Sequence, residues 1–186
     1  MQIIEFNASD PDLIDETFDV LLAAHAADTP ENPVPVRRFY TTTFTHAWPG
    51  RSRRWFAAVE DGRAIGLAAL TFWLDSNPHL AHVRLHVHPD HRRRGVGSAL
   101  LERVAGLAEE AGRTLLNTDA PLSWEGGPAR TEEGAAFLEK RGFKLALTSV
   151  NRRCRVDALE KSEEDRLSAE ALHAAEAYEL RQWKIG

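Results

Sequence analysis

The sequence predicts an α/β fold of the α+β kind, in which helices flank a mixed, mostly antiparallel central sheet. Three observations favour it. A strand-like segment, a glycine-rich loop and a helix follow one another over residues 81–111. Two strand-like segments meet at Asp61-Gly62, a pair typical of hairpin turns. Strands alternate with helices only in the second half, so the predicted order is β-α-α-β-β-β-α-β-α-β and the sheet should be mixed.

The first half of this order follows from local signals. Residues 2–6 have the pattern of a short strand. Residues 10–27 have apolar side chains spaced for one helix face, with Asp10 as a candidate N-cap and Pro11 at the first helical position. A proline-rich connection leads to a second helix over about residues 36–46, which Trp48-Pro49-Gly50 ends. Residues 54–60 and 64–74 then form the two strands of the hairpin.

The second half is organised around the strand, loop and helix of residues 81–111. Residues 81–88 alternate apolar and polar side chains, which predicts a strand with one buried face, and Pro89 should end it. From Val96, apolar residues recur at helical spacing until Gly112. Residues 114–119 have the pattern of a buried strand, and residues 120–130 that of a long loop. Thr131 is a candidate cap for the next helix, and residues 143–156 should form a long strand.

The loop before the central helix is suited to an anion. Gly95 and Gly97 have no Cβ, so a ligand can approach the backbone closely. The first N–H groups of a helix lack internal acceptors and lie at the positive end of its dipole, which favours a phosphate. Three consecutive arginines, residues 92–94, add positive charge there. The combination predicts a phosphate-binding loop.

These residues carry a family resemblance. Arg92-Arg93-Arg94-Gly95-Val96-Gly97 resembles the Arg/Gln-x-x-Gly-x-Gly/Ala signature of the GNAT superfamily of acyl-CoA-dependent N-acetyltransferases. The preceding Leu85-His-Val-His-Pro89 looks like the central strand of that family. Residues 135–143, Ala-Ala-Phe-Leu-Glu-Lys-Arg-Gly-Phe, resemble its later helix and Gly-Phe turn. The resemblance covers about residues 1–156.

The resemblance implies direct transfer of an acetyl group from acetyl-CoA, as cosubstrate, to a primary amine of a small molecule. It implies that a backbone N–H near Val87 holds the acetyl carbonyl and that the pyrophosphate lies on the N–H groups of residues 93–98. The residues expected to hold acetyl-CoA are Leu85, Val87, Arg92, Arg93, Arg94, Gly95, Val96, Gly97, Ser98 and Phe137.

Catalytic side chains are less evident from the sequence. His86 is the first candidate for the base, because it lies on the central strand and an imidazole titrates near neutral pH; His82, Asp119 and Glu125 are the others. The family often has a tyrosine that protonates the leaving thiolate, but this chain has Leu138 at that position. Another group or water must then serve, or the lobe is catalytically silent.

Composition and alternative motifs narrow the function further. The net charge of −5 argues against a nucleic-acid-binding protein. Because the start of the chain lacks a long apolar run, neither a signal peptide nor a membrane partner is expected. The single cysteine, Cys154, suits a reducing, cytoplasmic location and a packing role. His86-x-His88-x-Asp90-His91 also matches a zinc-hydrolase pattern, but only His173 follows, so no metal is expected.

The tail forms a separate region. We expect residues 1–156 to form the acetyl-CoA-binding domain and residues 157–186 to form a helix, over about residues 162–177, and a strand from Tyr178 to Lys184. That strand is either the last strand of the sheet or the opening strand of a second lobe, because the tail resembles the linker of tandem-GNAT proteins of the mycothiol synthase type. The expected partner is accordingly a second copy of the chain or a second GNAT lobe. Two functions stay open: an N-acetyltransferase, or a catalytically silent CoA-binding lobe of a tandem protein.

Overall fold

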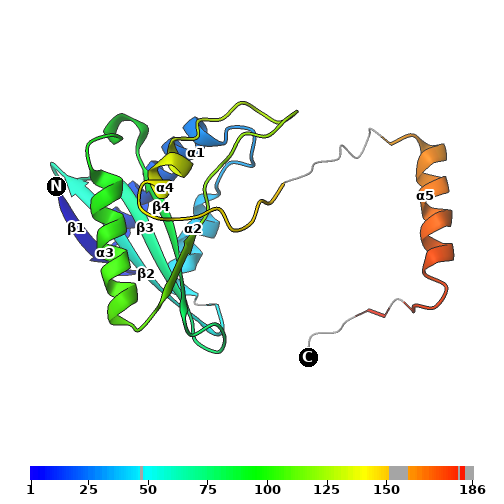
Figure 1. The fold of residues 1–186 in the computed structure, drawn as a ribbon, viewed down its shortest axis with the longest axis horizontal. Coiled ribbons are helices and arrows are strands. Elements are labelled where there is room, and N and C mark those ends of the chain that lie inside the picture. Colours follow the sequence, from blue (N-terminus) through cyan, green and yellow to red (C-terminus); the bar gives the residue numbers. More distant parts are fainter. Residues whose placement is uncertain (47, 151–158, 180, 183–186) are drawn as a thin grey trace. The chain divides into compact units, whose positions relative to one another are not determined.

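The computed structural model describes residues 1–46, 48–150, 159–179 and 181–182. The chain divides into two units, Met1–Lys144 and Leu145–Gly186, and each is described by itself. The elements in chain order (Figure 1) are β1 (Gln2–Phe6), α1 (Pro11–Asp28), α2 (Arg37–Thr45), β2 (Arg51–Glu60), β3 (Arg63–Trp73), β4 (Leu80–Val87), the 3₁₀ turn η1 (Pro89–His91), α3 (Val96–Glu110), β5 (Leu115–Thr118), α4 (Glu133–Glu139) and α5 (Lys161–Ala174).

The described strands form one sheet in the order β1-β2-β3-β4-β5. All neighbouring pairs are antiparallel except β4 and β5, which are parallel. The hairpin between β2 and β3 turns at Asp61 and Gly62, whose φ angles of 50° and 77° suit a tight hairpin turn. The predicted mixed, mostly antiparallel sheet is therefore confirmed, as is the hairpin.

Helices cover both faces of this sheet (Figure 1), and each face has its own hydrophobic core. On one face Leu100 and Val104 of α3 pack against Phe56, Leu70 and Val83 of the strands. On the other, Phe18 of α1 and Tyr40 of α2 pack against Phe6 and Leu67 of the strands. Gly66 of β3 lets α3 approach closely, because a Cβ there would lie 2.9 Å from side-chain atoms of Val96 and Leu100.

The alternation along β4 decides which side chains can serve a site. Val83 belongs to the core under α3 and Leu85 packs against that core. Because side chains alternate along a strand, His82, Arg84 and His86 project from the opposite face, where α1 lies. The polar residues of β4 therefore share one face of the sheet with α1.

Several predicted details differ in the structure. β5 is not buried: it is the last described strand of the sheet, and Leu115 is 53% exposed. Residues 143–150 form no strand, although their side chains suit one, because a strand needs a neighbouring strand to pair with. The rest of that expected strand, with Cys154 and the domain boundary at residue 156, lies outside the described residues.

The helix boundaries need smaller corrections. Asp10 occupies the N-cap of α1, but its carboxylate accepts from the Asn7 backbone N–H (2.9 Å) and makes no cap bond. α4 begins at Glu133 with Glu132 at its N-cap, so Thr131 precedes the cap. The tail helix is confirmed as α5, whereas the described residues between 178 and 182 carry no strand.

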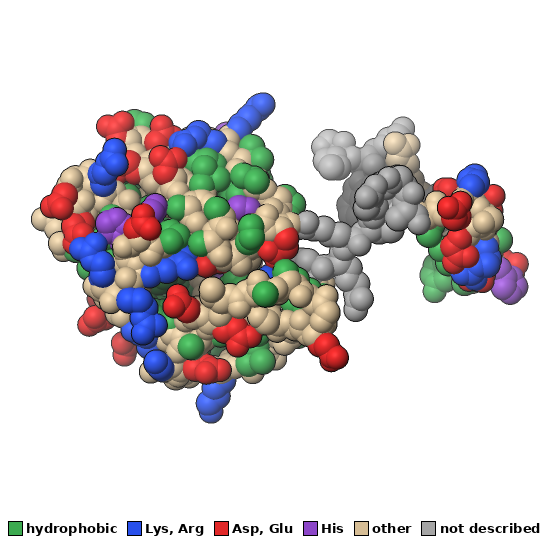
Figure 2. All heavy atoms as spheres, turned by 90° about the horizontal axis from the view of Figure 1, so that it is seen from above, with side chains coloured by type: hydrophobic (Ala, Val, Ile, Leu, Met, Phe, Trp, Pro, Cys, Tyr) green, Lys and Arg blue, Asp and Glu red, His purple; other side chains and the backbone are tan. Residues whose placement is uncertain are grey.

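The surface of the Met1–Lys144 unit mixes charges of both signs. Figure 2 shows acidic and basic side chains interspersed over the face that is in view. Within the described residues, no helix combines the length and the hydropathy that crossing a membrane requires.

Candidate active site

The glycine loop joins η1 to α3 through two residues in the left-handed region. Arg93 has φ 61° and Gly95, at the N-cap of α3, has φ 84°. Backbone turns of this kind make successive N–H groups converge on a common point. No side chain caps the helix. The N–H of Ala99 donates to the Gly95 carbonyl (3.0 Å), so the N–H groups of residues 96–98 precede the first helical hydrogen bond. The loop therefore presents a concave, positively polarised backbone surface.

The three arginines of the loop have different environments. Arg92 forms a two-pronged ion pair with the Asp28 carboxylate, both distances being 2.8 Å, and its Nε donates to the Val87 carbonyl (3.3 Å). Arg94 donates to Glu60 at 2.6 Å. Arg93 is exposed and has no hydrogen-bonding or ionic partner among the described residues. Arg92 and Arg94 thus fasten the loop to α1 and β2, and Arg93 supplies the free charge.

Gly97 lies between Phe137 of α4 and Val87 of β4. A Cβ added there would lie 3.5 Å from ring atoms of Phe137 and 3.5 Å from a methyl of Val87. Arg141 stabilises this arrangement: its guanidinium carbon lies 3.7 Å from the Phe137 ring centroid, and it donates to the Phe137 carbonyl (2.9 Å) and to Ser98 Oγ. Helical spacing does not predict this role of Arg141, because α4 ends at Glu139 and Arg141 lies in the turn that follows.

A gap in the sheet lies next to the loop. β5 pairs with β4 only from Leu80 to Val83, so among the described residues the rest of β4 has no partner strand on that side. The His88 N–H donates to Ile65 of β3 (3.0 Å), and backbone groups alternate along a strand, so the Val87 N–H faces the gap. An unpaired N–H in such a gap can stabilise a negative oxygen.

A cavity of about 220 Å³ passes through this gap. Its lining includes Leu85 and Leu101 on the α3 side, Asp28 on the α1 side, and Asp119, Phe137 and Leu138 near the opening between β4 and β5. Residues from both faces of the sheet line this cavity, and Leu85 of its lining lies two residues before Val87 on β4. The cavity therefore borders the part of β4 that carries the Val87 N–H.

His86 also lines the cavity. Burial lowers its pKa to about 4, the charges of Arg84 and Arg92 act in the same direction, and Asp28 opposes them. The imidazole is therefore neutral at pH 7. A base with so low a pKa is weak, since general bases work best with a pKa near the operating pH.

The other base candidates lie in different places. His82 Nδ1 lies 2.8 Å from Asn117 Oδ1, and its Nε2 lies 3.7 Å from an oxygen of Asp119. Asp119 lines the cavity, so this pair lies at its edge. Glu125 is exposed in the loop between β5 and α4 and is outside the lining.

The histidine-rich motif does not converge on one point. His88 Nδ1 accepts from the Asp90 N–H (3.3 Å), and its ring meets His91 edge-on with centroids 5.6 Å apart, whereas His86 lines the cavity. The described residues contain no group of three or more histidine, cysteine or acidic side chains that could hold a metal ion.

Comparison with known proteins places this geometry in a family. The model of the acetyltransferase (GNAT) family matches residues 19–123. A mycothiol acetyltransferase from Nocardiopsis dassonvillei is 39% identical over 85 residues, which are 46% of this chain and 25% of that protein. The chain therefore matches only a quarter of that relative's length.

Solved structures agree. A tandem GNAT protein from the clavulanic acid biosynthesis pathway matches with a TM-score of 0.69 and 29% identity, over 76% of this chain and 43% of that one. A ribosomal-protein-alanine N-acetyltransferase from Brucella melitensis, at 19% identity and a TM-score of 0.59, covers 83% of this chain and 100% of its own, and shows the shared fold. The family match spans the glycine loop and the gap beside it, and the chain therefore belongs to the GNAT acetyltransferase family.

Proposed function

We propose that this chain transfers the acetyl group of acetyl-CoA to the primary amine of a small molecule. The observation that carries the proposal is the position of the Val87 N–H. It faces the gap beside β4, next to a cavity lined by residues from both faces of the sheet and next to a helix N-terminus suited to a pyrophosphate. Family membership supplies the reaction type.

In this proposal the pyrophosphate lies on the N–H groups of residues 93–98, which the left-handed residues Arg93 and Gly95 orient. The pantetheine arm passes Gly97 and Phe137 and enters the gap beside Leu85. Arg92 and Arg94 act mainly by fixing the loop, since both are already paired with carboxylates.

The chemical step needs few side chains. The amine nitrogen attacks the thioester carbon, a C–N bond forms, and the Val87 N–H stabilises the oxyanion. The C–S bond then breaks, and the thiolate leaves with a pKa near ~8.5, that of an ordinary thiol. Leu138 cannot donate a proton, but a thiolate whose thiol has this pKa is a weak enough base to leave unprotonated and take a proton from solvent afterwards.

The amine must lose a proton before or during attack. An alkyl amine has a pKa near ~10 and is mostly protonated at pH 7. His86 lines the cavity and is neutral at pH 7, so we propose that it accepts this proton, directly or through water, and passes it on to solvent. Its low pKa keeps the proton transfer unfavourable and makes positioning of the amine the larger contribution.

Beyond this site, we propose that residues 1–156 form the acetyl-CoA-binding domain and residues 157–186 lead toward a second GNAT lobe. The support is the match to a tandem GNAT protein, of whose length this chain covers 43%. A second lobe is thus the proposed partner.

The test is a panel of small primary amines incubated with acetyl-CoA and the protein, with acetylated product detected by mass spectrometry. We expect product from at least one amine and strongly reduced product with a folded Gly97→Glu variant. Tight acetyl-CoA binding without product from any amine would contradict the proposal and favour a catalytically silent lobe.

A further inference from the structure

Three arginines lie on the face of the sheet that carries α1. Arg53 of β2 is in register with Thr71 of β3, which is in register with His82 of β4. Arg51 precedes Arg53 by two residues and Arg84 follows His82 by two, so all three arginines project from the same face. We call Arg51, Arg53 and Arg84 the arginine row.

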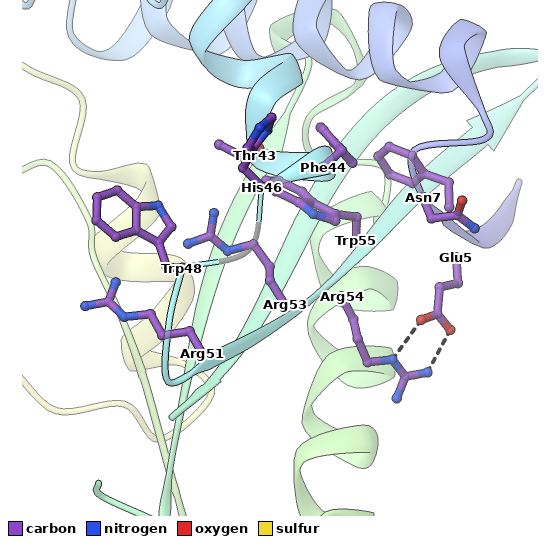
Figure 3. A pocket seen from close by; sticks show the side chains of 11 residues that line it. Glu5, Asn7, Thr43, Phe44, His46, Trp48, Arg51, Arg53, Arg54 and Trp55 are labelled. Carbon is purple, nitrogen blue, oxygen red and sulfur yellow. Dashed lines mark hydrogen bonds and ion pairs between the residues drawn. The ribbon is translucent and has the colours of Figure 1, made fainter. Parts of the chain in front are cut away.

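Part of this row lines a pocket of about 190 Å³ between β2 and the end of α2. Figure 3 shows Arg51 and Arg53 extending to the side of β2 where Trp48 lies, whereas Arg54 turns away to Glu5. The Arg53 Nε donates to Thr71 Oγ1 (3.1 Å).

Aromatic rings flank these two arginines. The Arg53 guanidinium carbon lies 5.3 Å from the Trp55 ring centroid, and that of Arg51 lies 5.7 Å from the Trp73 ring. Such contacts orient a guanidinium while leaving N–H groups along its edge available.

The arginine row lacks counter-ions. Several other arginines of this unit are paired with carboxylates: Arg37 with Asp15 and Asp19, Arg54 with Glu5, Arg92 with Asp28, and Arg94 with Glu60. No carboxylate among the described residues forms an ion pair with Arg51, Arg53 or Arg84. Burial lowers the pKa of Arg53, and the charges of Arg84 and Arg51 lower it further, so both neighbouring arginines repel the charge of Arg53. A bound anion would relieve this repulsion.

We propose that the arginine row binds the anionic group, a carboxylate or a phosphate, of the acceptor amine. Guanidinium groups suit both oxyanions because they donate several hydrogen bonds from one plane. That the anion belongs to the acceptor rests on the proposed acetyl transfer. The anion site itself rests only on the arrangement of the arginines.

The geometry sets the length of the acceptor. Arg84 lies three residues before Val87 on β4, about 10 Å at the rise of a strand. An amine that reaches the Val87 N–H with its anionic group at the arginine row must span roughly that distance or more. Short amino acids such as glycine would not reach both positions.

The first experiment compares acceptors that differ only at one end. The rates of acetylation of ω-aminoalkanoates, ω-aminoalkyl phosphates and ω-aminoalkanols of equal chain length are measured. We expect kcat/KM to favour the better anion over the alcohol by roughly 10- to 100-fold at chains of about 10 Å or longer. Arg53→Gln should remove the preference, and Arg63→Gln, an exposed arginine at the hairpin, should keep it. Equal rates for acids, phosphates and alcohols would overturn the proposal.

The second experiment does not depend on catalysis. Inorganic phosphate and glutarate are titrated into the protein, and the indole N–H signals of the tryptophans are followed by NMR. We expect saturable shifts for at least one anion, weakened about tenfold or more in Arg53→Gln and unchanged in Arg63→Gln. Arg84→Gln is the second test if Arg53→Gln does not fold. Equal shifts in the variants and wild type, or none with either anion, would refute the anion site. Anion binding without any acetyl transfer would instead retain the site and refute only the proposed function.

Discussion

Replacing Gly97 by glutamate tests the acetyl-CoA site at the position where the backbone must stay accessible. The added Cβ would meet Phe137 and Val87 at 3.5 Å, an ordinary contact, so the backbone can keep its conformation. The rest of the side chain must then extend from the start of α3 into the place proposed for the pyrophosphate. The expected result is a folded protein that binds acetyl-CoA poorly.

The size of the effect follows from the added charge. At a separation of about 5 Å, two unit charges repel by about 1 kcal/mol in water and about 3 kcal/mol at the effective dielectric of a protein surface. A loss of about 1–3 kcal/mol corresponds to a weakening of roughly 5- to 150-fold. Steric exclusion adds to this, so the electrostatic figure is a lower bound.

Isothermal titration calorimetry with acetyl-CoA measures the affinity, and Gly106→Glu is the matched control. Gly106 lies in the same helix, and a Cβ there would have no neighbour within 4 Å. The control adds the same charge two turns or more from the helix start and should bind acetyl-CoA almost as wild type does. Equal affinities in wild type and a folded Gly97→Glu protein would refute the position of the site.

Three further predictions concern stability and proton transfer. The pKa of His86 is about 4 in the folded state and ~6.5 in the unfolded state, so its contribution to stability is present above pH 6.5 and is lost as pH falls toward 4. Urea unfolding should show a loss of up to about 3 kcal/mol over this pH range in wild type, and no such loss in His86→Gln. Arg92→Ala leaves the Asp28 carboxylate without its partner and frees the glycine loop from α1, so the acetyl-CoA affinity measured by calorimetry should fall about tenfold. A fall no larger than that of Arg93→Ala would contradict the anchoring role of Arg92. Leu138 is only half-buried, so Leu138→Ala should lower the free energy of unfolding by about 1–2 kcal/mol in urea titrations. Leu138→Tyr should raise turnover in steady-state kinetics only if protonation of the thiolate limits the rate.

The sequence predicted the strand, loop and helix around Gly95 because local physics determines each part. Alternating side chains define β4, Pro89 ends it, and helical spacing begins at Val96. The hairpin at Asp61-Gly62 was predictable for the same reason, since its positive φ angles demand residues of this kind.

Contacts between distant segments were not predictable. Nothing in the local sequence shows that Asp28, at the end of α1, pairs with Arg92, or that Arg94 pairs with Glu60. The same holds for the low pKa of His86, which depends on burial against α1 and on Arg84 and Arg92. The sequence predicted a buried β5 because its residues are apolar. Its exposure follows from its place as the last described strand of the sheet, which its own residues do not reveal.

The most direct test of the central claim is transfer itself, measured as acetylated product by mass spectrometry, with wild type and Gly97→Glu compared on the amine panel. The account predicts product that depends on acetyl-CoA and protein and is strongly reduced in Gly97→Glu. Saturating acetyl-CoA binding by the wild type, with no acetylated amine across the panel, would contradict it.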